Sequence, residues 1–266
     1  METTYVHGYS ADEARRLNDQ ADTLANLLHA GTSYPPGSRV LEIGCGVGAQ
    51  TAHLVASSPG ARLVAIDRSA ESLETARRRM PGVEWHQADV FDMPFADEEF
   101  DHVFVCFVLE HLRDPSGALA ALRRVLKPGG TITVIEGDHA SAFFHPDSEL
   151  ARATIAHQIR LQAVAGGNAL LGRQLYPLLR EAEFEHVAVE PICVYADESR
   201  PDLVKGFTRN TFIALFEAAG DEAVAAGLTG RGEWQQGITD LRRIAQPGGT
   251  LHYTFFKALA TKGNSP

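Results

Sequence analysis

The chain has 266 residues, of which 44% are hydrophobic, and its formal net charge is −10 at pH 7. This length suits one large domain with a substantial buried core. The acidic balance offers no broad basic surface to a phosphate backbone, so we expect no nucleic-acid partner.

The first residues contain neither the basic region nor the apolar region of a secretory signal, and no apolar run approaches the length that spans a bilayer. The three cysteines, Cys45, Cys106 and Cys193, are far apart and include no C-x-x-C pair. This spacing argues against a disulfide framework and against a zinc site. We therefore expect a cytoplasmic protein with no membrane partner and no metal.

The N-terminal segment, residues 1–37, is predicted to form a helical cap. Ser10 and Glu13 have the spacing of a capping box, which starts a helix. Tyr9 directly precedes this helix, where its ring or hydroxyl can either close a reaction site or simply pack against the rest of the protein.

Five short β-branched runs follow between residues 38 and 137, separated by stretches of helical length. They read RVLEI, RLVAID, VEWHQ, DHVFVCF and TITVIEG. Such alternation of strands with helices is typical of a parallel sheet built from βαβ units. The continuous apolar run in DHVFVCF indicates a central strand covered on both faces. We expect residues 38–137 to form the ligand-binding core of a doubly wound α/β fold.

Beyond residue 137 the alternation breaks. Residues 138–184 are predicted to be mainly helical, and a second long stretch with helical segments covers residues 197–249. The remaining strand candidates read HVAVEPICVY and LHYTFFKAL. We expect residues 138–266 to complete the sheet, with helical insertions at about 140–171 and 197–249 that form a substrate lid.

The turn after the first strand reads VLEIGCGVGAQT and places Glu42, Gly44, Gly46 and Gly48 at every second position. Glycines at a strand-to-helix turn let a ligand approach backbone N–H groups at the start of the helix. In the dinucleotide fingerprint G-x-G-x-x-G, the third glycine comes one residue later than Gly48 does here. The turn predicts a nucleotide-like ligand, and Glu42 is a further departure from the dinucleotide pattern.

The ends of the next strands carry side chains that suit the rest of such a ligand, because ligands of a parallel sheet lie beyond the carboxyl ends of its strands. Asp67 ends the second strand, where an acid can accept hydrogen bonds from both ribose hydroxyls. Asp89 and Val90 follow the third strand and suit the edge and the face of an adenine. Phe107 stands at the end of the fourth strand.

Taken together, LEIGCGVG, VAIDRS, ADVFDMPF, FDHVFVCFVLEHL and LKPGGTITVIE follow one another between residues 41 and 136. In order and spacing they resemble the motifs of class I S-adenosylmethionine-dependent methyltransferases. The resemblance implies a Rossmann-like, mostly parallel sheet of seven strands whose last strand is reversed, for which LHYTFFKAL is the candidate. It also implies S-adenosyl-L-methionine as the cofactor and S-adenosyl-L-homocysteine as its product.

The same resemblance implies roles for single residues. Glu42 organises the glycine turn and the methionine tail of the cofactor, while Gln50 either touches this tail or stays on the surface. Arg68 either covers the adenine or remains solvated, and His111 either lies near the cofactor or borders the substrate pocket. The cofactor-binding positions that we expect are Glu42, Gly44, Cys45, Gly46, Gly48, Gln50, Asp67, Arg68, Asp89, Val90, Phe107 and His111.

Because the cofactor carries an electrophilic methyl group, we expect the protein mainly to align the acceptor and to exclude water. A general base is needed only if the acceptor must lose a proton. Asp138 and His139, directly after the fifth strand, are the candidate bases, and Tyr9 is the third candidate catalytic residue. Weaker candidates in the first insertion are His145, Arg173 and Tyr176.

The expected acceptor is a small molecule, such as an aromatic, phenolic, indole or amine compound, and the expected assembly is a monomer or a homodimer. Aromatic side chains of the insertions can form either an acceptor pocket or ordinary core; they are Phe143, Phe144, Tyr176, Tyr195, Phe207 and Phe212. Two other functions stay open, namely a regulator or partner subunit that binds S-adenosylmethionine without transferring methyl groups, and a nicotinamide-dependent oxidoreductase. The early third glycine and Glu42 count against the oxidoreductase.

Overall fold

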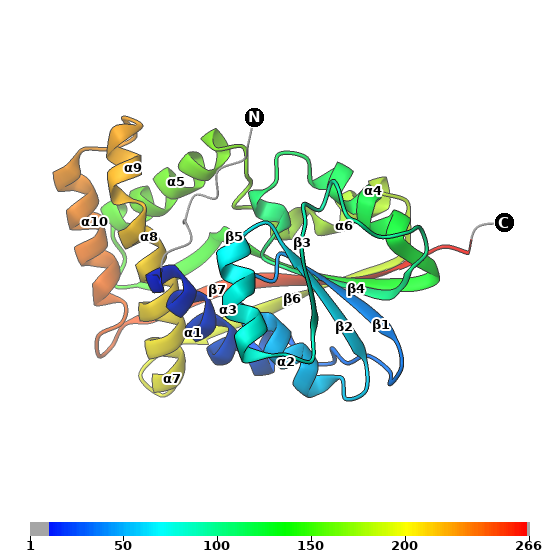
Figure 1. Cartoon of the computed structure of the whole chain (residues 1–266). Helices are drawn as coiled ribbons and strands as arrows, with labels where there is room; N and C mark the ends of the chain where they lie inside the picture. Colours follow the sequence, from blue (N-terminus) through cyan, green and yellow to red (C-terminus); the bar gives the residue numbers. More distant parts are fainter. Residues whose placement is uncertain (1–10, 265–266) are drawn as a thin grey trace.

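The computed structural model describes residues 11–264, and for residues 11–15 it describes only the backbone. Seven strands form one sheet in the order β3-β2-β1-β4-β5-β7-β6 (Figure 1). Neighbouring strands from β3 to β5 are parallel, and β7 runs antiparallel to both β5 and β6. This confirms the predicted α/β fold with a reversed last strand. The strands are β1 (Arg39–Ile43), β2 (Arg62–Asp67), β3 (Glu84–Gln87), β4 (Phe100–Cys106), β5 (Leu126–His145), β6 (Phe184–Ala196) and β7 (Thr250–Lys262).

Helices cover both faces of the sheet, and a further group of helices lies beyond one end of it. In Figure 1, α1, α2 and α3 lie on one face, α4 and α6 on the other, and α5, α8, α9 and α10 gather at the left. No helix of residues 11–264 is both long and apolar enough to cross a membrane. The helices are α1 (Ala11–Leu28), α2 (Ala49–Ser57), α3 (Ala70–Arg79), α4 (Pro115–Val125), α5 (Glu149–Val164), α6 (Leu175–Glu181), α7 (Pro201–Leu203), α8 (Ala214–Ala218), α9 (Gly220–Ala225) and α10 (Arg231–Arg243), with short 3₁₀ turns η1 (Leu109–His111) and η2 (Leu171–Gln174) and a π-helix η3 (Val204–Ile213).

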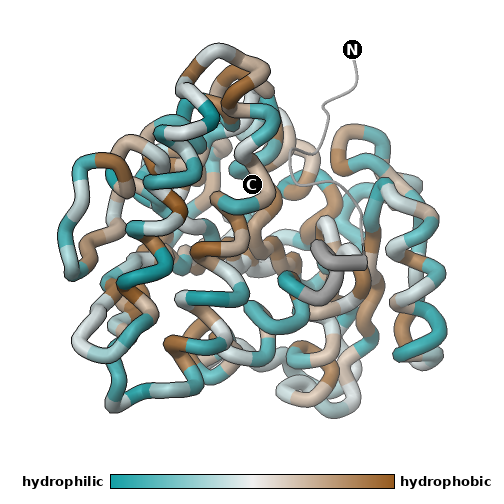
Figure 2. The backbone as a smooth tube through the Cα atoms, turned by 90° about the vertical axis from the view of Figure 1, so that its left-hand side faces the viewer, coloured by the Kyte–Doolittle hydropathy of each residue, from teal (hydrophilic) through white to brown (hydrophobic). Residues whose placement is uncertain are grey.

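The core follows from the apolar runs of the central strands. Phe100 and Phe104 of β4 are completely buried, as the prediction of a central strand covered on both faces requires. Hydrophobic and hydrophilic residues alternate along the outer helices (Figure 2), and α10, for example, buries Trp234, Ile238 and Leu241. Burial of these side chains therefore fixes the layers of the fold.

Strand β5 is longer than the sequence predicts. Helix is expected from residue 138 onward, but β5 continues to His145 and α5 begins only at Glu149. The last residues of β5 pair with the first residues of β7, with Phe144 opposite Leu251 and His145 opposite Thr250. This pairing joins residues more than a hundred positions apart, so local sequence periodicity does not reveal it.

Helix α1 is fastened to the sheet at its C-terminal end. The ammonium group of Lys257 in β7 donates hydrogen bonds to the carbonyls of Leu28 (3.2 Å) and Ala30 (2.7 Å) and to the hydroxyl of Thr32 (2.6 Å). Cationic side chains satisfy the unpaired carbonyls at helix C-termini and complement the helix dipole. This contact holds the C-terminal end of α1 against β7.

Candidate active site

The glycine turn after β1 is shaped by both backbone conformation and packing. Gly44 and Gly48 have φ angles of 64° and 79°, and a Cβ atom would lie 2.6 Å from Val108 at the first position and 2.5 Å from Met80 at the second. At Gly46, with φ of 52°, a Cβ atom would meet nothing within 4 Å. The middle of the turn therefore leaves open space beside its backbone, as a ligand cradle requires.

Asp67 at the end of β2 holds this turn in place. Its Oδ2 accepts a hydrogen bond from the Gly46 N–H and its Oδ1 accepts one from the Ser69 N–H, both at 2.8 Å. Burial raises the pKa of Asp67, and these backbone donors oppose the rise. Each carboxylate oxygen keeps a second lone pair, so the predicted contact with ribose hydroxyls is compatible with both bonds.

Glu42 lies beneath the turn and is 2% exposed. Its Oε2 has no hydrogen-bond partner among residues 11–264. Burial raises the pKa of Glu42 to about 8, and the nearby Thr51 hydroxyl opposes this rise. A buried carboxyl group with an unused oxygen is costly unless something pairs with it, so the position suits an ammonium group or a bound water.

The other predicted cofactor positions surround the same strand ends. Arg68 forms an ion pair with Asp89 at 3.4 Å, and Val90 is buried. The Gln50 side chain forms a hydrogen bond of 2.7 Å with His29 of the α1 end, which occupies its Oε1. Cys45 is buried, and burial raises the pKa of its thiol.

The loop after β4 lies between the glycine turn and the cavity described below. Phe107 has a φ of 58°, an uncommon conformation for a residue with a Cβ atom. Buried Glu136, at the end of the parallel part of β5, accepts hydrogen bonds from the N–H groups of Val108 (3.1 Å) and Leu109 (2.8 Å). Sequence reasoning missed Glu136, whose only signal was a lone acid in the apolar strand TITVIEG. It holds the strained loop in one conformation.

Glu110 in this loop is buried. Burial raises its pKa to about 7. The side-chain amide of Gln162 from α5 donates to the Glu110 carbonyl at 3.1 Å, and His111 lies 3.6 Å from the Glu110 carboxylate. The loop is therefore tied to α5 as well as to β5.

A cavity of about 60 Å³ lies next to this loop. Its walls come from the loop after β4, from β5 and β7, from the π-helix η3 with the start of α8, and from α1. Of the aromatic candidates from the insertions, Phe207 and Phe212 belong to the lining, while Phe143, Tyr176 and Tyr195 are exposed elsewhere. The lining residues are Arg16, Leu17, Gln20, Phe107, Glu110, His111, Gly137, His139, Phe207, Thr211, Phe212, Leu215, Tyr253 and Phe255.

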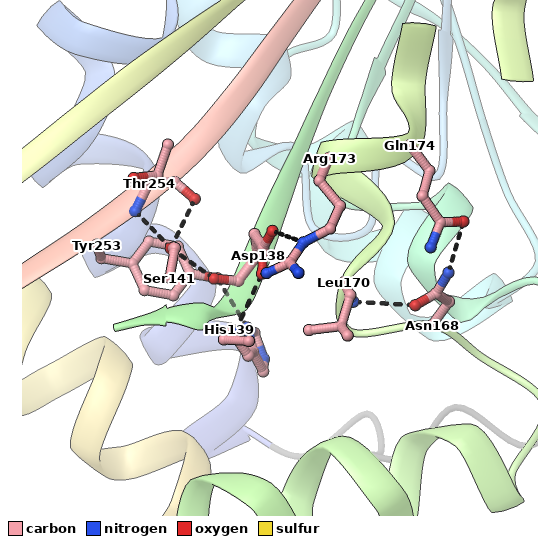
Figure 3. A network of polar contacts seen from close by, with 10 residues as sticks. Asp138, His139, Ser141, Asn168, Leu170, Arg173, Gln174, Tyr253 and Thr254 are labelled. Atoms are coloured by element: carbon pink, nitrogen blue, oxygen red, sulfur yellow. Dashed lines mark hydrogen bonds and ion pairs between the residues drawn. The ribbon is translucent and has the colours of Figure 1, made fainter. Parts of the chain in front are cut away.

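His139 reaches the cavity because the pairing of β5 with β7 is interrupted. Asp138 pairs with Thr254 and Phe143 with His252, so residues 139–142 lie opposite Tyr253 alone. The Ser141 hydroxyl replaces the lost ladder bonds, accepting from the Thr254 N–H at 2.9 Å and donating to the Asp138 carbonyl at 2.6 Å (Figure 3). Such bulges often re-aim side chains beside active sites.

The two candidate bases are placed differently. His139 lines the cavity, and its Nδ1 lies 2.7 Å from the hydroxyl of Tyr253, a residue that sequence reasoning missed. Asp138 is absent from the lining, and both of its carboxylate oxygens accept hydrogen bonds from the guanidinium of Arg173 (Figure 3). This ion pair supports a structural role for Asp138. Tyr9, the third candidate, lies outside the described residues.

Comparisons with known proteins decide the family. Residues 41–134 match the family model described as a methyltransferase domain. The O-methyltransferase cnsE of Penicillium expansum is 31% identical over 265 residues, which cover 96% of this chain and 84% of that relative. The chain belongs to the class I S-adenosylmethionine-dependent methyltransferases.

Other relatives of this methyltransferase chain match over shorter parts of their length. An uncharacterised 37.1 kDa protein in transposon TN4556 of Streptomyces fradiae is 38% identical over 215 residues. The matched residues make up 79% of this chain and 59% of that protein. The demethylmenaquinone methyltransferase of Clavibacter sepedonicus is 45% identical over 38% of this chain, which spans 41% of that enzyme.

Solved structures share the fold at low sequence identity. The [4+2]-cyclase SpnF superimposes with a TM-score of 0.56 at 21% identity, covering 93% of this chain and 82% of the cyclase. Phosphoethanolamine N-methyltransferase 2 of Haemonchus contortus, solved with S-adenosyl-L-methionine, gives a TM-score of 0.57 at 18% identity, with coverages of 91% and 52%. The same architecture therefore occurs in proteins named for different reactions.

The ion pair between Arg173 and Asp138 yields a stability prediction. The Asp138 side chain is 2% exposed and that of Arg173 is 48% exposed. Arg173→Met leaves the carboxylate buried without its cation, so the free energy of unfolding at pH 7 should fall by about 2–3 kcal/mol, less than for a fully buried pair. Urea denaturation monitored by circular dichroism measures this loss.

Two further variants control this experiment. Arg152→Met removes a guanidinium from an exposed ion pair with Asp147 and should change stability by less than about 0.5 kcal/mol. Combining Asp138→Asn with Arg173→Met should restore most of the loss, because no buried charge remains. Equal stability of the Arg173→Met and Arg152→Met variants would contradict the structural role.

Proposed function

We propose that this chain transfers the methyl group of S-adenosylmethionine to a small aromatic molecule bound in the cavity beside His139. One observation carries the proposal: the loop of residues 107–111 serves both sites. Val108 packs against the glycine turn, where a Cβ atom on Gly44 would lie 2.6 Å away. Phe107, Glu110 and His111 line the cavity. A donor on the turn and an acceptor in the cavity would thus meet across one short loop.

The residues around the turn fit this cofactor. When bound, S-adenosylmethionine supplies an electrophilic methyl group on a sulfonium. The unpartnered Oε2 of Glu42 suits the ammonium of its amino-acid tail. Asp67, Arg68, Asp89 and Val90 would hold the ribose and the adenine. Once ionised, the Glu42 carboxylate would attract an ammonium group and repel the pyrophosphate of a nicotinamide dinucleotide.

The cavity walls would align the acceptor and keep water out. Phe207, Phe212, Tyr253 and Phe255 supply flat apolar surfaces, and His139 supplies a polar group. Positioning of this kind can contribute about 7–11 kcal/mol to a reaction barrier. The positive charge of the sulfonium already activates the methyl group. Orientation of the acceptor and exclusion of water therefore matter more than acid–base chemistry.

The size of the cavity limits how an acceptor enters. Its volume of about 60 Å³ is smaller than the ~150 Å³ cavity that holds a benzene ring in a protein core. Aromatic acceptors would therefore bind only when lining side chains move apart. Phe207 and Phe212 belong to the π-helix η3, a type of helix often found at functional sites.

The protonation of Glu42 tests the cofactor site. With a pKa of about 8, this carboxyl group is mostly protonated at pH 7. A bound ammonium lowers that pKa, so binding of S-adenosylhomocysteine should release a proton and should tighten as the pH rises from 6 to 8. Isothermal titration calorimetry in two buffers of different ionisation enthalpy measures the released proton.

The matched variants are Glu42→Gln and Glu222→Gln. Glu42→Gln should abolish the proton release and weaken binding at pH 8 by about 10- to 100-fold, the loss of a hydrogen bond to a charged group. Glu222 is exposed, and its replacement should change neither quantity. Binding without proton release in the unaltered protein would contradict the role of Glu42.

The transfer reaction is tested with S-adenosylmethionine labelled in its methyl group and a panel of phenols, quinols, indoles and amines. Aromatic acceptors should be labelled. Phe212→Ala should lower kcat/KM for the acceptor by at least about tenfold without changing the affinity for S-adenosylhomocysteine, because Phe212 lines only the cavity. Phe143→Ala, which alters an exposed ring outside the cavity, is the control. Cofactor binding with no labelled product from any acceptor would favour a regulator without transferase activity.

A further inference from the structure

The hydrogen bond between His139 and Tyr253 fixes which nitrogen of His139 faces the cavity. Nδ1 of the imidazole contacts the Tyr253 hydroxyl at 2.7 Å. His139 also lines the cavity, and no other hydrogen bond from its ring is made to residues 11–264. Nε2 is thus the ring nitrogen available to an acceptor. What it can do there depends on whether it carries a hydrogen.

His139 is neutral at physiological pH. The titratable and charged groups around it are Asp138 on the same strand, itself bound to Arg173, Arg16 on α1, and Glu110 and His111 of the loop after β4, which line the same cavity. Burial and the positive charge of Arg16 lower the pKa of His139 to about 4, although Asp138 opposes this. Near neutral pH the ring therefore carries one hydrogen, on either Nδ1 or Nε2.

Tyr253 decides between these two positions because it keeps its own hydrogen. Burial and the carboxylates of Glu110, Asp138 and Glu136 raise its pKa well above the usual range. The backbone N–H of Asp138 faces the Tyr253 oxygen as a donor. Tyr253 is only 2% exposed, so its hydroxyl hydrogen cannot be donated to water and needs an acceptor within the protein. His139 Nδ1, at 2.7 Å, is the acceptor within hydrogen-bond distance. Nδ1 therefore accepts, and the ring hydrogen sits on Nε2.

We propose that Tyr253 is a positioning residue that holds His139 as a hydrogen-bond donor toward the cavity, so that the site takes acidic aromatic hydroxyl compounds as their oxyanions. This inference rests on the proposed methyl transfer. Nε2–H can stabilise a phenolate or enolate oxygen but cannot accept its proton. Arg16 and Glu110 line the same cavity, and burial raises the pKa of Glu110 to about 7, so an anionic acceptor is favoured where Glu110 is neutral.

The step balances without a base from the protein. The acceptor loses its proton to solvent before it binds. A lone pair of the oxyanion forms the bond to the methyl carbon, the carbon–sulfur bond breaks, and its electron pair stays on sulfur as a neutral thioether. His139 keeps its hydrogen throughout, and Tyr253 keeps its own.

The tautomer is read directly by NMR of protein labelled with ¹⁵N-histidine. The signals that disappear in His139→Gln belong to His139. In the unaltered protein, Nδ1 should show the shift of a nitrogen without hydrogen and Nε2 that of a nitrogen carrying one. Tyr253→Phe should shift this pattern toward a mixture of tautomers, whereas Tyr195→Phe, a change to an exposed ring, should leave it unchanged. A hydrogen on Nδ1 in the unaltered protein would overturn the proposal.

The acceptor class is tested by the pH dependence of kcat/KM for phenols of different acidity. The break in each profile should follow the pKa of the phenol, and Tyr253→Phe should lower kcat/KM by about tenfold with unchanged affinity for S-adenosylhomocysteine. A break at one pH for all phenols would instead indicate a base in the enzyme and overturn the proposal. No product from any acceptor would overturn the proposed function and the acceptor class with it, while the NMR experiment would still decide the tautomer.

Discussion

The candidate site depends on one irregularity in the sheet, the interrupted pairing of β5 with β7. Residues 139–142 occupy the space opposite Tyr253, so the chain leaves the ladder just where the parallel strands end. Three side chains stabilise this departure: Ser141 replaces ladder bonds, Arg173 neutralises buried Asp138, and Tyr253 binds His139. A regular β5 would turn successive side chains alternately to the two faces of the sheet, so the interruption sets the direction of the His139 side chain.

The second structural requirement is the loop after β4, which lies between the glycine turn and the cavity. Glu136 fixes the loop by accepting from two consecutive N–H groups, and Gln162 fixes it from the side of α5. Phe107 is thereby held in a left-handed conformation that other contacts must maintain. The loop, the glycine turn and the cavity wall are positioned together, which suits a reaction that depends on alignment.

Much of the fold could be predicted because each strand carries its own apolar run and each turn its own glycines or acids. The sheet, the reversed last strand and the central position of β4 are confirmed. The assignments of the cofactor-binding residues remain predictions. Tyr253, Glu136 and the continuation of β5 to His145 could not be predicted, because they arise from pairings across long stretches of chain. His139 and Tyr253, for example, are 114 residues apart, and no local pattern connects them.

We propose that the glycine turn and the cavity form one reaction site on either side of residues 107–111. A crystal structure of this chain with S-adenosylhomocysteine tests it most directly. We expect the amino-acid tail beside Glu42, the ribose at Asp67, and the sulfur next to Phe107 and facing the cavity that contains His139. A ligand bound at the turn with its sulfur directed away from this cavity, or bound elsewhere on the protein, would show that the turn and the cavity do not form one reaction site.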